Sequence, residues 1–320
     1  MRSAGSIEKA GLDHAGLGLT VSTLGEAGIR ARLASGGLAL QTGLYRLRLL
    51  SDVPAISRAV ALLYADYPLL DAGSYCDFTL SVQRPANLRR WVKPQVLAYF
   101  DGQPLFEPLP LGHAFPLMEW GLNFCATTLS FDHLTAHAAV LERGGRAVIL
   151  PAPSGSGKST LCAALLHRGW RLLSDELTVI DLDASRVWPV ARPVSLKNRS
   201  IDIIGAFAPE AVFCDPTHDT TKGTVAHMRV PAEHLARMNE PAVPAWIVFP
   251  RWVADAQAEL TPRDKAETVL DLAQNSFNGP QLGLDGFRAM TALIDRCDCL
   301  DFAYGRLDDA VRVFDALAAV

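Results

Sequence analysis

The feature that most constrains the fold is a glycine-rich segment, residues 152–160, which directly follows the apolar run 147–150. The apolar run is typical of a buried strand, and residues 161–166 after the glycines are suited to a helix. A strand followed by a glycine-rich loop and a helix forms a phosphate-binding loop, because the glycines let several backbone N–H groups point at one anion. The sequence therefore predicts an α/β fold with a triphosphate at the start of that helix.

We expect this loop to bind ATP and Mg²⁺. Lys158 places a cation near the outer phosphates, and the Ser159 hydroxyl can ligate the metal. Ala152 stands where the strict pattern has its first glycine. An accidental Gly-Lys-Ser in a surface turn is the competing interpretation, which the flanking strand and helix patterns disfavour. The expected nucleotide-binding residues are Pro153, Ser154, Gly155, Ser156, Gly157, Lys158, Ser159 and Thr160.

Composition excludes several other classes of protein. The chain has 320 residues, of which 49% are hydrophobic and 20% charged, so it can bury one large core or two smaller ones. A net charge of −4 argues against broad nucleic-acid binding. No apolar stretch approaches the roughly 18 residues of a membrane span, and the first residues lack the apolar centre of a secretion signal. We therefore expect a cytoplasmic protein, with its six cysteines as free thiols rather than zinc ligands.

Pattern divides the chain into residues 1–130, expected as a small α/β domain for recognition or assembly, and residues 131–320, expected as the catalytic domain. Residues 1–43 show weak periodicity and are expected as a loosely held start, and 214–231 as a long polar loop. Strands are expected at 44–49, 78–82, 95–100, 135–141, 146–150, 170–173 and 244–253, with a hairpin over 177–190. Helices are expected at 56–70, 116–129, 158–168, 267–277, 284–295 and 307–317.

An acidic pair, Asp175 and Glu176, follows the expected strand 170–173. Phosphoryl transfer needs a metal to neutralise charge and, for a hydroxyl acceptor, a carboxylate to receive the proton. The expected metal ligands are therefore Ser159, Asp175 and Glu176. A solvated acidic turn is the alternative for this pair.

The order of these motifs resembles the HPr kinase/phosphorylase group, bacterial serine kinases with a phosphate-loop fold akin to phosphoenolpyruvate carboxykinase. The pattern runs Ser154-Gly155-x-Gly157-Lys158-Ser159, then Arg168-Gly169-x-Arg171-Leu172, then the acidic pair. Residues 137–138, 195–198 and 222–227 are similar to the branch called HPr kinase-related kinase A. The resemblance runs from about residue 44 to the C-terminus, with its motifs between 135 and 230.

The resemblance implies a role for several residues. Asp175 matches the acid that takes the proton from the substrate serine, and Glu176 replaces a second aspartate. His137 matches a histidine near the active centre, although alone it would more often be a core histidine. The glycine-rich signature helix of the bifunctional enzymes is absent. Residues 195–199 stand in its place, with Lys197 where an acid would be, which argues against reversal of the reaction. Relatives assemble into rings, so a homo-oligomer is expected by analogy.

The sequence thus predicts an ATP-dependent serine kinase that acts on a peptide or small protein, with catalytic residues Asp175, Lys158, His137 and Lys222. Residues 218–223 are expected as a lid that places Lys222 or Arg229 over the transferring phosphoryl group, with a plain surface loop as the alternative. Two other functions stay open at this point. One is a nucleotide-binding switch or scaffold with weak ATPase activity, and the other is a kinase of a small hydroxylated metabolite.

Overall fold

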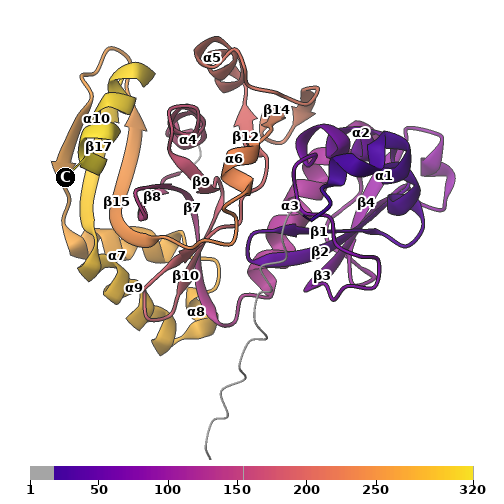
Figure 1. Cartoon of the computed structure of the whole chain (residues 1–320), viewed down its shortest axis with the longest axis horizontal. Helices are drawn as coiled ribbons and strands as arrows, with labels where there is room; N and C mark the ends of the chain where they lie inside the picture. The colour runs from indigo at the N-terminus through magenta and orange to yellow at the C-terminus, as the bar shows by residue number, and fades with distance from the viewer. Residues whose placement is uncertain (1–17, 154, 320) are drawn as a thin grey trace, which may run out of the picture.

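The computed structural model describes residues 18–153 and 155–319. The described strands form sheets of six, eight and three strands, with helices packed against them (Figure 1). The protein is therefore mixed α/β, which confirms the fold class in its coarser form. None of the described helices is both long and apolar enough to cross a bilayer.

Residues 18–128, called the front part below, contain the six-stranded sheet, ordered β1-β2-β3-β4-β5 with β6 against β4. Strand β2 alternates buried and exposed residues, as a strand with one covered face should. The strands are β1 (Leu38–Thr42), β2 (Tyr45–Ser51), β3 (Phe78–Gln83), β4 (Gln95–Phe100), β5 (Gln103–Pro104) and β6 (Leu109–Pro110). The helices are α1 (Gly25–Ala34), α2 (Pro54–Leu63) and α3 (Ala114–Thr128), with 3₁₀ turns η1 (Val21–Leu24), η2 (Leu88–Arg90) and η3 (Leu111–His113).

Residues 133–319, called the rear part, contain the eight-stranded sheet, ordered β11-β10-β7-β8-β15-β17-β16 with β9 also against β7. The strands β8, β15 and β17 are parallel, and the middle residues of β8 and β15 are apolar and buried, which fits cover on both faces there. The strands are β7 (His133–Arg143), β8 (Arg146–Pro151), β9 (Arg171–Ser174), β10 (Leu177–Asp181), β11 (Val187–Trp188), β15 (Val243–Trp252), β16 (Glu259–Pro262) and β17 (Asp298–Tyr304).

A small third sheet stands beside the phosphate-loop helix, in the order β12-β14-β13. Its strands are β12 (Val194–Lys197), β13 (Thr217–Thr220) and β14 (Gly223–Met228). The rear helices are α4 (Lys158–Leu166), α5 (Arg199–Phe207), α6 (Ala232–Leu235), α7 (Lys265–Gln274), α8 (Gly279–Leu282), α9 (Leu284–Arg296) and α10 (Leu307–Ala319). Figure 1 shows α4 between α5 and α10, while α7, α8 and α9 cover the opposite region of the sheet.

Helix α4 is buried almost all round, because it is covered by the sheet, α5 and α10. Its residues 161–166 are all buried, which explains why they are apolar or small without a helical stripe. One core runs from the front part through α4 to α10, and a second fills the space between the sheet and α9. All six cysteines are free thiols, as expected, and four of them are buried.

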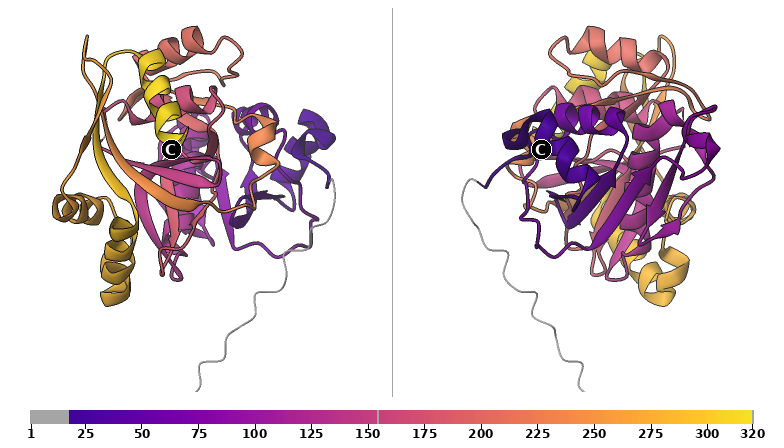
Figure 2. Two further views of the ribbon diagram at one scale, coloured as in Figure 1. Left: turned by 60° about the vertical axis from the view of Figure 1, so that its left-hand side comes forward. Right: turned by 90° about the vertical axis from the view of Figure 1, so that its right-hand side faces the viewer.

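The two parts meet along α3 and the loop after β1 (Figures 1 and 2). Leu44 donates its backbone N–H to the Pro189 carbonyl at 3.0 Å. Gly43 has φ +64°, and a Cβ there would lie 2.0 Å from the same carbonyl oxygen, so only glycine fits this crossing point. The Phe115 and His227 rings meet edge to face at 5.0 Å. These contacts fix the front part against the rear part.

Most of the expected strands and helices are present, and several regions differ. Residues 18–43 hold α1 and β1 rather than a loose start, because tertiary burial of Ile29, Leu33 and Leu38 compensates for a weak local pattern. Residues 1–17 lie outside the described part. The helix expected over 56–70 ends at Leu63, and the backbone of Leu69 and Leu70 bonds to Leu19 and Ala39 instead.

The third difference is the expected polar loop 214–231, which contains the hairpin β13–β14. The alternation of buried and exposed residues that is typical of a strand is not visible in this segment. Most of β13 is exposed, and residues 225–228 of β14 are all buried. Strand β17 was also not expected. It lies between β15 and β16, and its strand conformation follows from pairing with these two strands rather than from its own hydrophobic pattern.

Candidate active site

Strand register brings the expected site residues to one edge of the rear sheet. Strand β7 pairs with β8, β9 and β10, and it aligns Ala138 with Pro151 and Val140 with Ser174. The phosphate loop and the acidic pair therefore leave the sheet at the same end, on either side of β7. His137, opposite Leu177, lies at the same edge.

The phosphate loop is held by the ends of β15 and β17. The Trp252 backbone N–H donates to the Ser156 carbonyl at 2.9 Å, and the Tyr304 hydroxyl donates to the Gly157 carbonyl at 3.1 Å. Gly157 has φ +93°, and a Cβ there would lie 2.6 Å from the Tyr304 oxygen. Ser154 lies outside the described residues. The loop is thus a braced turn that ends where α4 begins at Lys158.

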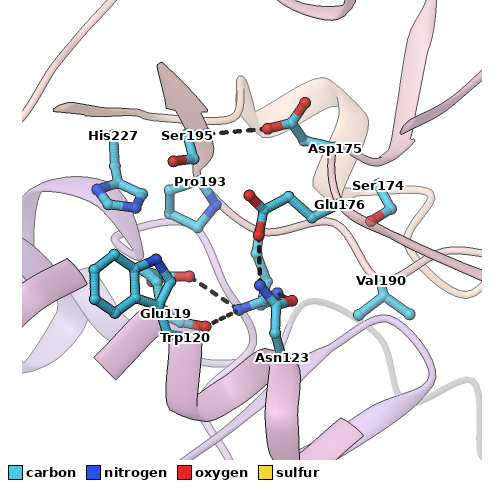
Figure 3. Close-up of a pocket in the computed structure, with 11 residues that line it drawn as sticks. Glu119, Trp120, Asn123, Ser174, Asp175, Glu176, Val190, Pro193, Ser195 and His227 are labelled. Carbon is cyan, nitrogen blue, oxygen red and sulfur yellow. Dashed lines mark hydrogen bonds and ion pairs between the residues drawn. The ribbon is translucent and has the colours of Figure 1, made fainter. Parts of the chain in front are cut away.

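A cavity of about 980 Å³ opens beside this loop. Its polar lining includes residues expected from the sequence and others that were not. Expected residues around it are His137, Pro153, Gly155, Ser156, Gly157, Lys158, Ser159, Thr160, Glu176, Lys197, Arg199 and Lys222; unexpected ones include Ser195, Asn198, Trp252, Tyr304 and Arg306. Asp175 borders a smaller adjoining recess that also contains Glu176 and Ser195 (Figure 3).

Lys158 is buried and lies 3.1 Å from the Nε2 atom of His137. Burial lowers the pKa of Lys158, while Asp175 and Glu176 oppose that shift. Burial and the neighbouring Lys158 lower the pKa of His137 to about 4. His137 is therefore neutral near pH 7, and its Nε2 accepts a hydrogen bond from the ammonium group. This contact positions Lys158 in the cavity.

Asp175 is buried, and its Oδ2 accepts the backbone N–H of Ser195 at 3.1 Å. Its Oδ1 is buried and makes no geometrically defined hydrogen bond. Burial, together with the charge of Glu176, raises the pKa of Asp175 to about 6, and Lys158 opposes that shift. The Ser159 hydroxyl, which lowers this pKa in part, is close to the carboxylate but does not saturate it, so a cation or an acceptor hydroxyl can still bind there. The residues present therefore fit a hard cation.

Glu176 points the other way, toward α3 of the front part (Figure 3). Its Oε2 accepts from the Asn123 side-chain amide at 2.5 Å. Burial would raise the pKa of Glu176, but the charges around it outweigh burial and lower it. The cations responsible are Lys222, Arg192, Lys197 and Lys158. The pKa of Asp175 is thus raised, whereas the pKa of its neighbour in the chain, Glu176, is lowered.

Behind Glu176 lies a buried network that crosses between the two parts. Arg192 bonds both to the Asn123 side-chain oxygen and, at 3.0 Å, to a carboxylate oxygen of Glu119. Tyr64 donates to the other Glu119 oxygen at 2.6 Å. Sequence reasoning missed these residues. The one local signal was the presence of Glu119 and Asn123, four residues apart, in an otherwise apolar helix.

The hairpin β13–β14 carries Lys222 at its turn. The Asn198 side-chain oxygen accepts the Thr224 N–H at 3.0 Å, which ties the hairpin to the start of α5. The Lys222 ammonium lies 5.4 Å from the centre of the Trp120 ring. Burial lowers the pKa of Lys222, against the opposing charge of Glu176. Lys222 therefore borders the cavity from a fixed hairpin.

Arg229 does not share that position, so its expected role over the phosphoryl group is wrong. Its guanidinium bonds to Asp66 of the front part, and it lines a different cavity. The reason is the β14 register, which carries residues 228–229 away from the hairpin turn.

The acidic pair and Ser159 do not form a complete metal centre by themselves. Across residues 18–153 and 155–319, no three His, Cys, Asp or Glu side chains are grouped as a metal site. Mg²⁺ at a phosphate loop also takes oxygen ligands from the phosphates and from water. Two carboxylates and a hydroxyl are therefore enough ligands from the protein.

Comparison with models of protein families gives no match to this chain, and comparison with curated proteins gives none either.

Proposed function

We propose that this chain is an ATP- and Mg²⁺-dependent kinase that transfers the γ-phosphate to a serine hydroxyl of a peptide or small protein. Its rear part would be a phosphate-loop kinase domain of the HPr kinase-like type. The observation that carries the proposal is the position of Asp175. A buried carboxylate with a raised pKa follows β9, which flanks β7 on the side opposite to the phosphate-loop strand β8, and the Ser159 hydroxyl of that loop lies close enough to lower this pKa in part.

The phosphate end of the cavity is suited to a triphosphate. Lys158, Lys197 and Lys222 bring positive charge to one space, and the N-terminus of α4 faces it. Ser159 and the acidic pair would hold Mg²⁺, which when bound neutralises charge on the β- and γ-phosphates. Lys158, positioned by His137, would bind the outer phosphates.

Asp175 and Glu176 would have different roles in the reaction, because their environments differ. Glu176, with its pKa lowered by four cations, stays ionised and suits a metal ligand. Asp175, with its pKa near 6, is the better proton acceptor. In the transfer step the serine oxygen bonds to the γ-phosphorus and the bond to the β–γ bridging oxygen breaks. ADP leaves, and the hydroxyl proton passes to Asp175.

Lys158→Met is the decisive variant, because it removes the cation and keeps much of the side-chain length in a buried position. Purified protein is incubated with MgATP and a serine-containing peptide library, and products are analysed by mass spectrometry. We expect phosphopeptide from the wild type and at least a hundred-fold less from the variant. Lys265→Met, on an exposed site outside the cavity, is the matched control.

Three outcomes would contradict the serine-kinase proposal. Undiminished transfer by Lys158→Met would exclude the phosphate loop as the site. Loss of ATP without any phosphorylated product would favour a switch or scaffold with ATPase activity. Phosphate recovered in a small hydroxylated metabolite, with no labelled polypeptide, would favour a metabolite kinase.

A further inference from the structure

The cavity beside the phosphate loop is lined by two chemically different sets of side chains. One set comprises the lysines and Glu176 that phosphoryl transfer would use. The other set, called the apolar end below, consists of apolar side chains that transfer does not need: Ile203, Ala206, Phe207, Trp252 and Leu307. A charged phosphate chain gains nothing from contact with apolar side chains, whereas a planar nucleobase can pack against them.

Trp252 is the most informative residue of this apolar end. It ends β15, and 53% of its surface is exposed although it is large and aromatic. Its indole N–H donates to the Gly305 carbonyl at 3.1 Å, and its backbone N–H bonds to the phosphate loop at Ser156. The ring is therefore held in one orientation beside the loop while much of it remains open to solvent. Such a preorganised aromatic face binds a planar partner with little loss of side-chain entropy.

Helix α5 contributes the other apolar side chains. Ile203 is 43% exposed, and Phe207 has one face covered by the Arg168 guanidinium at 4.2 Å from the ring centre. Helix α5 also contacts α4, so these residues lie close to the helix that starts at Lys158. The residues of the apolar end on α5 are therefore close to the phosphate site, and Figure 1 shows α5 next to α4.

We infer that this apolar end is the nucleobase site, that Trp252 is its stacking platform, and that it binds purine nucleotides more tightly than pyrimidine nucleotides. The inference rests on the proposed function, because a base is present only if a nucleoside triphosphate binds the loop. Stacking depends on the area of the π face rather than on particular hydrogen bonds. The larger bicyclic bases therefore gain more, and adenine and guanine are both accepted.

The experiment measures separately how much the base and the phosphates contribute to binding. Calorimetry measures binding of the Mg²⁺ complexes of tripolyphosphate, ATP, GTP and UTP to the wild type, Trp252→Ala, Trp252→Phe and Trp91→Ala. Trp91, 70% exposed on the front part, is the matched control. We expect Trp252→Ala to weaken ATP and GTP binding roughly ten-fold to a hundred-fold, with UTP affected less and tripolyphosphate unchanged. Trp252→Phe keeps a stacking face and retains most of the affinity.

Ile203→Asn gives an independent check, since its site is exposed on a helix and the substitution adds no charge that would repel the phosphates. It should weaken ATP and leave tripolyphosphate unchanged. The inference is overturned if Trp252→Ala leaves ATP binding unchanged, if it weakens ATP and tripolyphosphate equally, or if UTP binds the wild type as well as ATP. Failure of the wild type to bind tripolyphosphate and ATP at all would instead refute the proposed function, and the base site with it.

Discussion

The two walls of the candidate active site, which comprises the large cavity and the recess that adjoins it, are built in different ways. The phosphate-loop wall comes from one continuous stretch, 151–160, braced by the ends of β15 and β17. The opposite wall comes from α3 of the front part, which reaches Glu176 through Asn123 and is tied to Arg192 more than sixty residues later in the chain. The glycine-rich loop is therefore mainly a local property of this sequence, while the setting of the acidic pair is a property of the assembled fold.

This difference identifies where the front part can influence chemistry. Residues 18–128 do not contribute to the phosphate loop, yet they supply the hydrogen bond that orients Glu176 and the buried carboxylate that pairs with Arg192. Two substitutions test whether the α3 wall matters as the contacts indicate, and a third tests the environment of Asp175.

The largest effect on stability is expected for Arg192→Met. It removes the cation from the buried pair with Glu119 and leaves a buried carboxylate without its counter-charge. The expected loss in the free energy of unfolding is about 3–5 kcal/mol, measured by denaturant titration. In the double variant Glu119→Gln/Arg192→Met the charge is gone from both sides, so part of the stability should return. A double variant no more stable than Arg192→Met would contradict this account of the wall.

A smaller effect is expected for Asn123→Ala, which removes the hydrogen bond to Glu176 but keeps both acids. Phosphoryl transfer should fall roughly ten-fold, with a change in stability of about 1–3 kcal/mol, because Glu176 and Arg192 each lose a partner. Nucleotide binding by the loop should stay near the wild-type value. Asn87→Ala, at a 3₁₀ turn outside the cavity, is the control. Equal activity of the two variants would show that α3 does not position the acid.

The smallest effect concerns pH and Asp175 in magnesium-free protein. Its pKa in the fold, about 6, lies above the ordinary value, so the folded state favours the protonated form. The corresponding stability is fully present below about pH 4 and is lost as pH rises through 6. Asp175→Asn removes this dependence. The variant should gain on the order of 1–3 kcal/mol over the wild type between pH 4 and pH 7.5.

Thermal unfolding across that pH range, in the presence of a chelator, measures the difference. Asp255→Asn, on an exposed turn, provides the comparison for a generic loss of one carboxylate. A gap between Asp175→Asn and the wild type that does not change with pH would mean that Asp175 is not held in a raised-pKa environment.

The sequence alone indicated much of the rear sheet and the phosphate side of the site. The strand 146–150, the glycines and Lys158 form a contiguous pattern in which each residue has a local physical reason, so the position of the loop could be predicted to within a residue. The acidic pair could be placed because it ends the strand after that helix. The hairpin 214–231 and β17 could not, since their burial comes from neighbouring strands that the local pattern does not contain.

What the sequence determined by itself was a glycine-rich turn between a buried strand and a buried helix, with a lysine, a hydroxyl and two carboxylates at known spacing. Only the tertiary structure decided that Asp175 faces Ser195 while Glu176 faces Asn123, and that Arg229 pairs with Asp66 instead of bordering the cavity. The physical reason is how far apart in the sequence the interacting residues lie. Backbone turns and strand ends follow from adjacent residues, whereas pKa shifts and ion pairs depend on charges that distant segments bring within a few ångströms.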